Sequence, residues 1–171
     1  SAIVNFLEDK TYSSSSLNTY IACPLRFYFQ YVLGLKEKEV LLDEPEALDI
    51  GNFIHELLNE AFTKFIGKKP KFDSKNRKDF FALFEERFNS NFNVRKRSGA
   101  FMLKEVMEYR LSRFWNEEAA RGVEEIYALE EEFKGTLKLG KRSFKFHGFI
   151  DRIDSLNDGS IVILDYKTGN I

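Results

Sequence analysis

The chain has 171 residues, a length that suits one domain with a single sizeable core, and 18 of these residues are Phe. Lys and Arg total 26 against 27 for Asp and Glu, and the net charge of −1 excludes binding of nucleic acid by bulk positive charge. Since no apolar run approaches the roughly 18 residues of a membrane span and no N-terminal signal pattern is visible, we expect a cytoplasmic protein.

Helical periodicity covers the first part of the chain up to Gly122. Each expected helix combines a capping residue or Pro at its start with apolar residues three and four positions apart. The expected helices lie after the Ser-rich cap Ser13–Ser16, at 24–33, at about 46–66, after Ser74 with its stripe of Phe residues, and at 99–121.

After Gly122 apolar and polar residues alternate, which predicts β-strands. The expected strands cover 126–139, 143–154 and 160–167, with turns at Gly140 and at Asn157–Gly159. Helices followed by a β-meander are typical of an α+β fold.

The third expected strand begins with an apolar run and ends in charged residues. Alternation places Asp165 and Lys167 on one face, where burying charges is unfavourable unless they are paired or bind a metal. Asp151, on the second strand, also lies between apolar neighbours of the same face.

The length of the loop between these two strands decides which residues face each other. If the loop is Asn157–Gly159, Asp151 and Asp165 face each other with Cβ atoms about 4.5–5.5 Å apart. A two-residue loop would set Asp151 opposite Tyr166 instead.

Two facing carboxylates repel each other, and a divalent cation between them would turn this repulsion into a binding site. Asp151, Asp165, a backbone carbonyl such as that of Tyr166, and waters are ligands that Mg²⁺ accepts. Lys167 would orient the attacking water or neutralise charge developing on a phosphate. A structural ion pair explains the same residues, and geometry alone leaves both interpretations open.

His55 offers a nitrogen ligand. It lies four residues after Gly51, on the apolar stripe of the expected helix at 46–66. Gly inside a helix costs ~1 kcal/mol relative to Ala, so we expect Gly51 to serve a close contact that brings His55 to the carboxylates. A hydrogen-bonded core histidine is the competing interpretation, and we interpret His147 as structural.

Three segments of the chain form a recognisable set. They are Tyr12-Ser-x-Ser-x-Leu17-x-x-Tyr20-x-x-Cys23-Pro24-x-x-Phe27-Tyr28 with Leu33-Gly34-Leu35, then Gly51-x-x-x-His55, then Gly148-Phe149-Ile150-Asp151-Arg152-Ile153-Asp154 with Asp165-Tyr166-Lys167-Thr168-Gly169. In them the chain resembles the PD-(D/E)XK nucleases of the RecB and AddB type. The resemblance implies helices on a mixed sheet of the restriction-endonuclease-like type, in a single nuclease domain over 1–171 with a helical insertion at 68–122.

The resemblance also implies roles for individual residues. The matching histidine and two acidic residues of the family hold Mg²⁺ or Mn²⁺, and its lysine assists the water, which assigns His55, Asp151, Asp165 and Lys167. Family members usually add an acidic residue on the first strand. Glu130 is a weak candidate for it, because its place in a run of three glutamates favours a solvated side chain.

The activity implied by the resemblance is hydrolysis of phosphodiester bonds in DNA. The family often acts on DNA ends, as an exonuclease, or on single strands. It works in DNA break repair and recombination, beside a helicase subunit or a fused helicase domain.

Two departures from the family pattern have consequences. Many AddB-type members hold a four-cysteine iron–sulfur cluster, but this chain has only Cys23, so we expect no cluster within it. The family core also continues past the Lys-Thr-Gly segment with a helix and a strand, whereas the sequence ends at Ile171. We therefore expect a fragment of a larger helicase–nuclease-type or repair protein, in which the C-terminal part of the core is missing.

Two other functions stay open. One is a non-catalytic DNA-binding or scaffold module of a helicase–nuclease complex, although all four expected chemical groups are present. The other is a CRISPR-adaptation-type nuclease, which shares the catalytic residues but usually bears the cluster.

Basic residues outside the site are candidates for contacts with DNA phosphates. The main candidate is the run Arg95, Lys96 and Arg97, and the others are Lys68, Lys69, Arg77 and Lys78. Solvated loops and helix faces explain these charges equally well.

Overall fold

The computed structural model describes residues 2–35, 47–92 and 100–167. These residues form two compact units. Unit 1 comprises 2–35 and 132–149, and unit 2 comprises 47–92, 100–131 and 150–167. Helices and a mixed four-stranded sheet give the chain the α+β fold that its sequence predicts.

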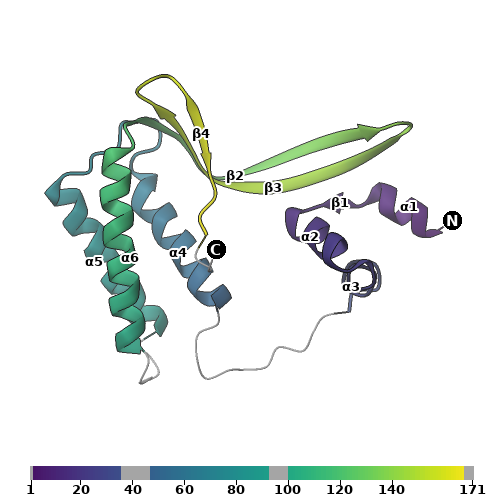
Figure 1. Ribbon diagram of the computed structural model, residues 1–171, viewed down its shortest axis with the longest axis horizontal. Coiled ribbons are helices and arrows are strands. Elements are labelled where there is room, and N and C mark those ends of the chain that lie inside the picture. The colour runs from purple at the N-terminus through teal and green to yellow at the C-terminus, as the bar shows by residue number, and fades with distance from the viewer. Residues whose placement is uncertain (1, 36–46, 93–99, 168–171) are drawn as a thin grey trace. The chain divides into compact units, whose positions relative to one another are not determined.

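Strand β3 (Arg142–Leu156) is the centre of the sheet, and β2 (Val123–Leu139) is its neighbour in a long hairpin (Figure 1). Two short strands complete the sheet by pairing with β3, β1 (Thr11–Tyr12) in parallel and β4 (Ile161–Leu164) antiparallel. Both hairpin strands are longer than their patterns predict, β4 is shorter, and β1 was not predicted.

The connection between β3 and β4 confirms the predicted loop, Asn157–Gly159. The amide of Leu156 donates to the carbonyl of Ser160 at 2.9 Å, and Gly159 takes a φ of 82°, which suits a glycine in this kind of turn. The register pairs Arg152 with Leu164, so the position one residue beyond this pair sets Asp151 against Asp165.

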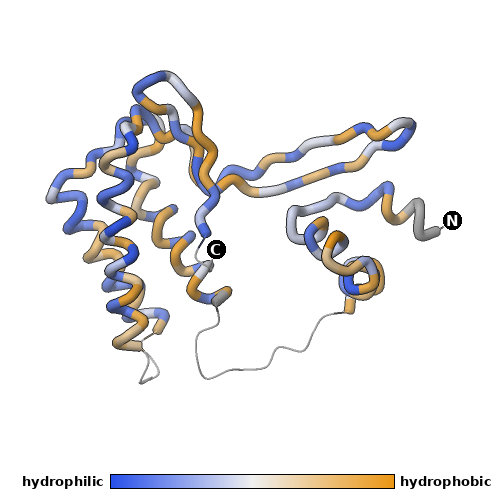
Figure 2. The backbone as a smooth tube through the Cα atoms, viewed as in Figure 1, coloured by the Kyte–Doolittle hydropathy of each residue, from blue (hydrophilic) through white to orange (hydrophobic). Residues whose placement is uncertain are grey.

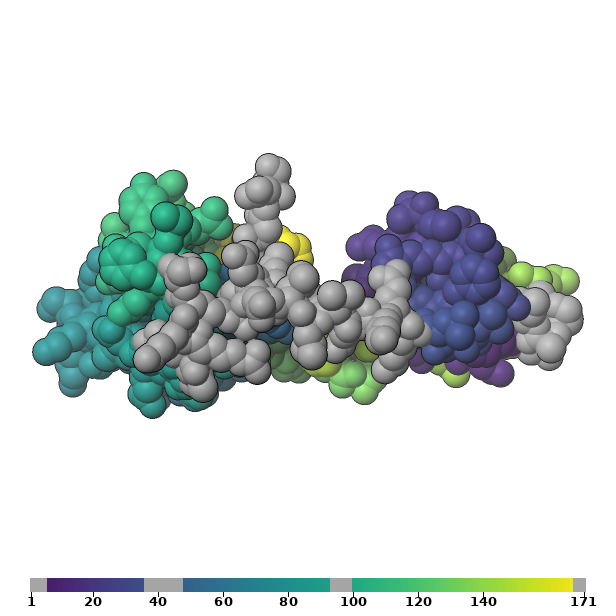
Figure 3. Space-filling view, turned by 90° about the horizontal axis from the view of Figure 1, so that it is seen from below, coloured from purple at the N-terminus to yellow at the C-terminus, as the bar shows by residue number. Residues whose placement is uncertain are grey.

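The helices of unit 1 pack around buried aromatic side chains. They are α1 (Ala2–Asp9), α2 (Ser14–Ala22), α3 (Pro24–Phe27) and the π-helix η1 (Tyr28–Val32). The side chains of residues 6–32, in purple, form one body in Figure 3. Ser13 caps α2, as predicted, by accepting a hydrogen bond from the amide of Ser16 at 3.2 Å. Tyr12 of β1 is buried and stacks on Phe27.

The helices of unit 2 form a core rich in Phe. They are α4 (Ala47–Thr63), α5 (Ser74–Phe92) and α6 (Ala100–Ala120), close to the predicted ranges. Phe53, Phe84 and Phe88 meet edge-on or tilted, as aromatic rings prefer. None of the helices in the described ranges is long and apolar enough to cross a lipid bilayer.

A buried ion-pair network joins α6 to β3. Its two cations are Arg152 and Arg121, and its two anions are Glu118 and Asp154. Arg152 donates from Nε to Asp154 at 2.6 Å, and its Nη1 forms an ion pair with Glu118 at 2.9 Å. Arg121 contacts the same two carboxylates at 2.7 Å and 3.0 Å.

The ion-pair network is charge-balanced and almost sealed from water. Arg152 and Asp154 have no exposed surface, and Glu118 is 3% exposed. The guanidinium of Arg152 also lies 4.5 Å from the centre of the Phe62 ring. Since each charge has a partner of opposite sign, the network fixes β3 to α6 without leaving an isolated buried charge.

Replacing Glu118 by Gln should lower the free energy of unfolding by about 3 kcal/mol, because it leaves the buried Arg152 and the partly buried Arg121 with one carboxylate. Urea unfolding followed by circular dichroism measures the change. Glu117→Gln is the matched control: this neighbour on α6 is 69% exposed and pairs only across one helical turn with Arg113, so a loss below about 0.5 kcal/mol is expected. Equal losses in the two variants would contradict the role of the network.

Candidate metal centre

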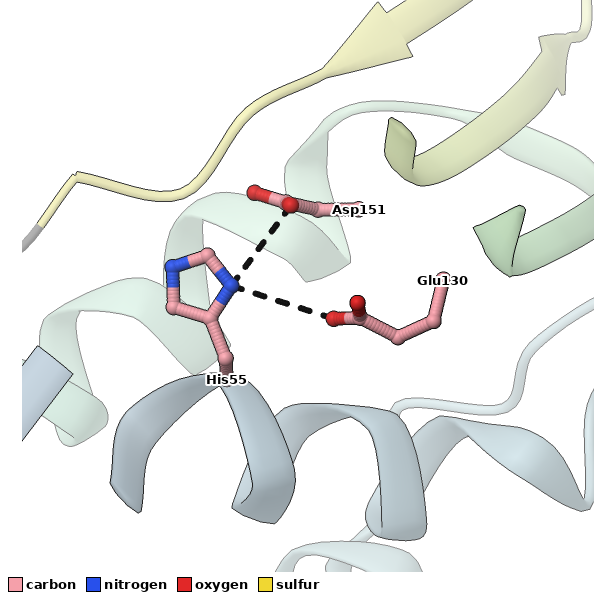
Figure 4. Close-up of side chains that lie close together, drawn as sticks. All are labelled: His55, Glu130 and Asp151. Carbon is pink, nitrogen blue, oxygen red and sulfur yellow. Dashed lines mark ion pairs between the residues drawn. The ribbon is translucent and has the colours of Figure 1, made fainter. Parts of the chain in front are cut away.

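Three elements of unit 2 bring His55, Glu130 and Asp151 together (Figure 4). His55 comes from α4, Glu130 from β2 and Asp151 from β3. One ligand atom from each lies within 4.8 Å of the other two, and the side chains are 30%, 35% and 9% exposed, respectively. The centre is therefore open to a small ion but closed enough to raise the cost of unbalanced charge.

The hydrogen bond of His55 determines which of its ring nitrogens is free. Nε2 lies 3.0 Å from the carbonyl oxygen of Tyr166. Since a carbonyl only accepts, Nε2 carries the hydrogen, and in the neutral ring Nδ1 keeps its lone pair. Nδ1 faces the carboxylate oxygens of Asp151 at 3.5 Å and of Glu130 at 3.8 Å, as the dashed lines in Figure 4 show.

Asp151 is held by the same residue that orients His55. Its Oδ2 accepts a short hydrogen bond, 2.5 Å, from the backbone amide of Tyr166. Its Oδ1 is the atom that faces His55. Tyr166 therefore fixes one ligand through its amide and another through its carbonyl, and its ring packs edge-on against His55.

Glu130 reaches the centre because its backbone conformation is unusual for a residue in a strand. Its φ is +50°, a left-handed conformation inside a strand, which turns the side chain out of the regular alternation. Burial and the charge of Asp151 raise the pKa of Glu130, and His55 opposes this rise. The sequence had favoured a solvated glutamate; the structure places it in the centre.

Asp165 and Lys167 lie after the last residue of β4. They pair with each other, with Lys167 Nζ at 2.7 Å from Asp165 Oδ2, and their side chains are 62% and 70% exposed. The expected burial of two facing carboxylates thus holds for Asp151 but not for Asp165.

The geometry of the centre fits a divalent cation. Ligand atoms lie about 2.0–2.1 Å from Mg²⁺, so two of them are at most about 4.2 Å apart. The distances from His55 Nδ1 to Asp151 and Glu130, 3.5 Å and 3.8 Å, lie below this limit. A metal-bound histidine commonly donates its other N–H to a backbone carbonyl, as His55 does here. With Nδ1 unprotonated, its lone pair and two carboxylates present electron-rich atoms to the same point, an arrangement that a bound divalent cation would stabilise.

The remaining predicted residues lie elsewhere. His147 belongs to unit 1, Cys23 is exposed, and Arg95–Arg97 fall outside the described residues. The buried network partners Glu118 and Arg121 received no role from the sequence. In the sequence, Glu118 and Arg121 appear only as polar residues at the C-terminal end of the helix that became α6.

Comparison with known proteins identifies the family. The family model of the PD-(D/E)XK nuclease superfamily matches residues 11–170. This match includes every residue of the metal centre, together with Asp165 and Lys167.

Three relatives illustrate what the chain is similar to. A protein of Clostridium perfringens, named as a subunit of an ATP-dependent helicase/deoxyribonuclease, is 35% identical over 185 residues, covering 92% of the chain and 15% of the relative. A protein of the same name from Streptococcus agalactiae is 30% identical, covering 91% and 14%. An uncharacterised protein of Rickettsia felis is 32% identical, covering 93% and 19%. The chain thus spans less than a fifth of the length of these relatives.

Glu130→Gln should stabilise the cation-free protein at neutral pH by less than about 1 kcal/mol, because it removes repulsion between neighbouring carboxylates. A carboxyl whose pKa is raised on folding loses stability as the pH rises through that pKa, so the gain should vanish in acid. Thermal unfolding in EDTA across this pH range measures the effect. The exposed neighbour Glu131→Gln is the control, and an equal gain there would contradict the prediction.

Proposed function

The chain belongs to the PD-(D/E)XK nuclease superfamily, and we propose that it is a divalent-metal-dependent DNA nuclease whose active site is the centre of His55, Glu130 and Asp151. The observation that carries this proposal is the convergence of His55 Nδ1 with the carboxylates of Asp151 and Glu130, with no Lys or Arg side chain between them in the described part of unit 2. The fold is accordingly of the restriction-endonuclease-like type.

Some residues of the centre would bind the cation, and Tyr166 positions two of them. Mg²⁺ or Mn²⁺ in this centre would supply a water of lowered pKa and stabilise negative charge on the phosphate. Asp151 and Glu130 provide carboxylate oxygens, and His55 provides Nδ1. Tyr166 keeps Asp151 and His55 in place through its backbone. Its carbonyl oxygen accepts from Nε2, on the side of the imidazole ring away from Nδ1, so it orients the histidine and does not bind a cation held at Nδ1.

Asp165 and Lys167 join this centre when the cation binds. The β3–β4 register sets position 165 opposite Asp151, one residue beyond the last pair. The Asp165–Lys167 ion pair is exposed, so breaking it costs less than about 1 kcal/mol. Asp165 would supply a further carboxylate to a bound cation, and the ammonium group of Lys167, no longer paired with it, would be available to orient the attacking water.

An apolar pocket beside the centre supports unpaired DNA as the substrate. The pocket lies between α4 and α6 and has a volume of about 320 Å³. Its lining includes Ile54, Met107, Phe114 and Tyr166, with the cationic groups Arg110 and Lys167 also in contact. An unpaired base fits apolar and aromatic walls, and its phosphates fit the cations.

The names of the relatives support a biological setting for this proposal. A protein similar to subunits of ATP-dependent helicase/deoxyribonucleases would cut DNA ends or single strands produced by a helicase. Exonuclease activity in break repair and recombination, a helicase subunit or fused helicase domain as partner, and a cytoplasmic location are parts of this proposal.

Asp151→Asn and Lys167→Ala should each lower the rate of DNA cleavage at least about 100-fold, the first by weakening the cation site and the second by removing a proton-handling group. Asp165→Asn should do the same if Asp165 joins the centre. Release of nucleotides from labelled single-stranded DNA in Mg²⁺ or Mn²⁺ measures the rate. Asp79→Asn, exposed on α5, is the control and should cleave at the wild-type rate.

A second measurement separates cation binding from cleavage. Bound Mn²⁺ at roughly 100 times its Kd should stabilise the folded wild type by about 2–3 kcal/mol, and Asp151→Asn should lose this gain. Stabilisation by Mn²⁺ without cleavage by the full-length protein would favour the non-catalytic module. Cleavage that survives both Asp151→Asn and Lys167→Ala would exclude this site.

A further inference from the structure

The outer part of the β2–β3 hairpin, 132–149, differs in charge from the rest of the chain. It holds five basic residues and one acidic residue, a net charge of +4 in a chain whose total is −1. All six charged side chains are exposed, namely Glu132, Lys134, Lys138, Lys141, Arg142 and Lys145. The positive charge of the described unit 1 is therefore concentrated on this one hairpin.

Hydrophilic and hydrophobic residues alternate along the strands of the hairpin (Figure 2). Because neighbouring side chains of a strand point to opposite faces, the hairpin has an apolar face and a basic face. On the apolar face, Phe144 and Phe146 lie against the ring of Tyr12, at centroid distances of 6.2 Å and 5.9 Å. Phe133 of β2 shares this face, because a Cβ added to Gly148 would lie 2.6 Å from its ring. The apolar face thus meets the buried aromatic residues of unit 1.

The opposite side, which we call the basic face, consists of residues of the other parity. It comprises Lys134, Thr136 and Lys138 on β2 and Ser143, Lys145, His147 and Phe149 on β3, with Glu132 as its acidic member. Glu132 pairs with Lys134 at 2.9 Å. Lys138 and Lys145 form no ion pair with the residues that the structure describes, so their charges are available to a partner.

We propose that the basic face binds the phosphate backbone of DNA, with Phe149 as a platform on which an unpaired base stacks. The choice of DNA as the polyanion rests on the proposed function. Lys side chains supply charge to phosphates, and the hydroxyls of Thr136 and Ser143 supply hydrogen bonds of the kind that position a backbone. Phe149 is 61% exposed although it is aromatic, and aromatic rings among lysines are typical of surfaces for single strands.

The test is the affinity of the full-length protein for a fluorescent oligodeoxynucleotide in EDTA, where no cleavage interferes. Lys134→Gln, Lys138→Gln and Lys145→Gln in one variant should raise the Kd for single-stranded DNA about 10- to 100-fold near 0.1 M salt. The slope of log K against log salt should fall in magnitude by about 2. The corresponding Lys→Arg variant keeps the charges and should bind like the wild type.

A matched control removes three positive charges elsewhere. Lys64, Lys71 and Lys75 are exposed on unit 2, and replacing all three by Gln should leave the Kd and the salt slope nearly unchanged. An equal loss of affinity in this control would mean that only total charge matters, and it would overturn the proposal. Circular dichroism and the melting temperature establish that each variant folds.

Phe149 has its own test. Phe149→Ala should weaken binding of single-stranded DNA about fivefold or more and leave duplex binding unchanged, because only an unpaired base can stack on the ring. Phe101→Ala, with its side chain 74% exposed on α6, is the aromatic control. Equal effects on single-stranded and duplex DNA would overturn the stacking role.

The outcomes separate this inference from the proposed function. Wild-type cleavage with unchanged affinity and salt slope in the triple Gln variant would overturn the basic face and leave the nuclease intact. Loss of affinity in the triple variant of a protein that cleaves nothing would support the basic face and remove the nuclease. Loss of binding to vesicles containing phosphatidylserine, with DNA binding unchanged, would overturn DNA as the partner in favour of an anionic membrane.

Discussion

The metal centre depends on the backbone of one residue, Tyr166. Its amide holds Asp151 and its carbonyl orients His55, so a shift of this residue along the chain would move two ligands at once. Tyr166 is fixed by burial of its side chain, whose ring meets that of Phe114 at 6.0 Å. Burial also raises the pKa of Tyr166 to about 12, an effect that Arg152 opposes, and the hydroxyl therefore stays neutral. The ion-pair network and the metal centre thus share Tyr166 as their link.

Two groups of charged residues lie on opposite faces of β3. The numbers of acidic and basic side chains in each group indicate their different roles. Asp151 faces the metal centre, whereas the next residue, Arg152, belongs to the buried ion-pair network, because neighbouring residues of a strand point to opposite faces. The network contains as many cations as anions, so it is complete without a ligand. The metal centre contains two carboxylates and one histidine, and no Lys or Arg of the described residues pairs with either carboxylate, so its acidic groups outnumber its basic ones. An unbalanced, partly buried group of this kind is a candidate for function rather than for stability.

The sequence predicts those parts of the site that depend on local geometry. The loop Asn157–Gly159 sets the β3–β4 register, and regular alternation then places Asp151 correctly. Glu130 could not be predicted in the same way, because its positive φ breaks the alternation inside β2. Asp165 lies beyond the end of β4, where alternation no longer determines which side chains are buried. The two-residue strand β1 exists only through its pairing with β3, which no local pattern reveals.

Net charge alone is a poor guide to whether a protein acts on DNA. With +4 on the outer hairpin, the remainder of a chain of net charge −1 carries −5. Two of those negative charges converge at the metal centre, where a divalent cation would cancel them and present a locally neutral or positive surface to a phosphate. A DNA strand that binds to lysine side chains requires positive charge only on the part of the protein surface that it touches. A near-neutral total is therefore compatible with a nuclease, provided that the acidic groups hold a metal and the basic groups share one face.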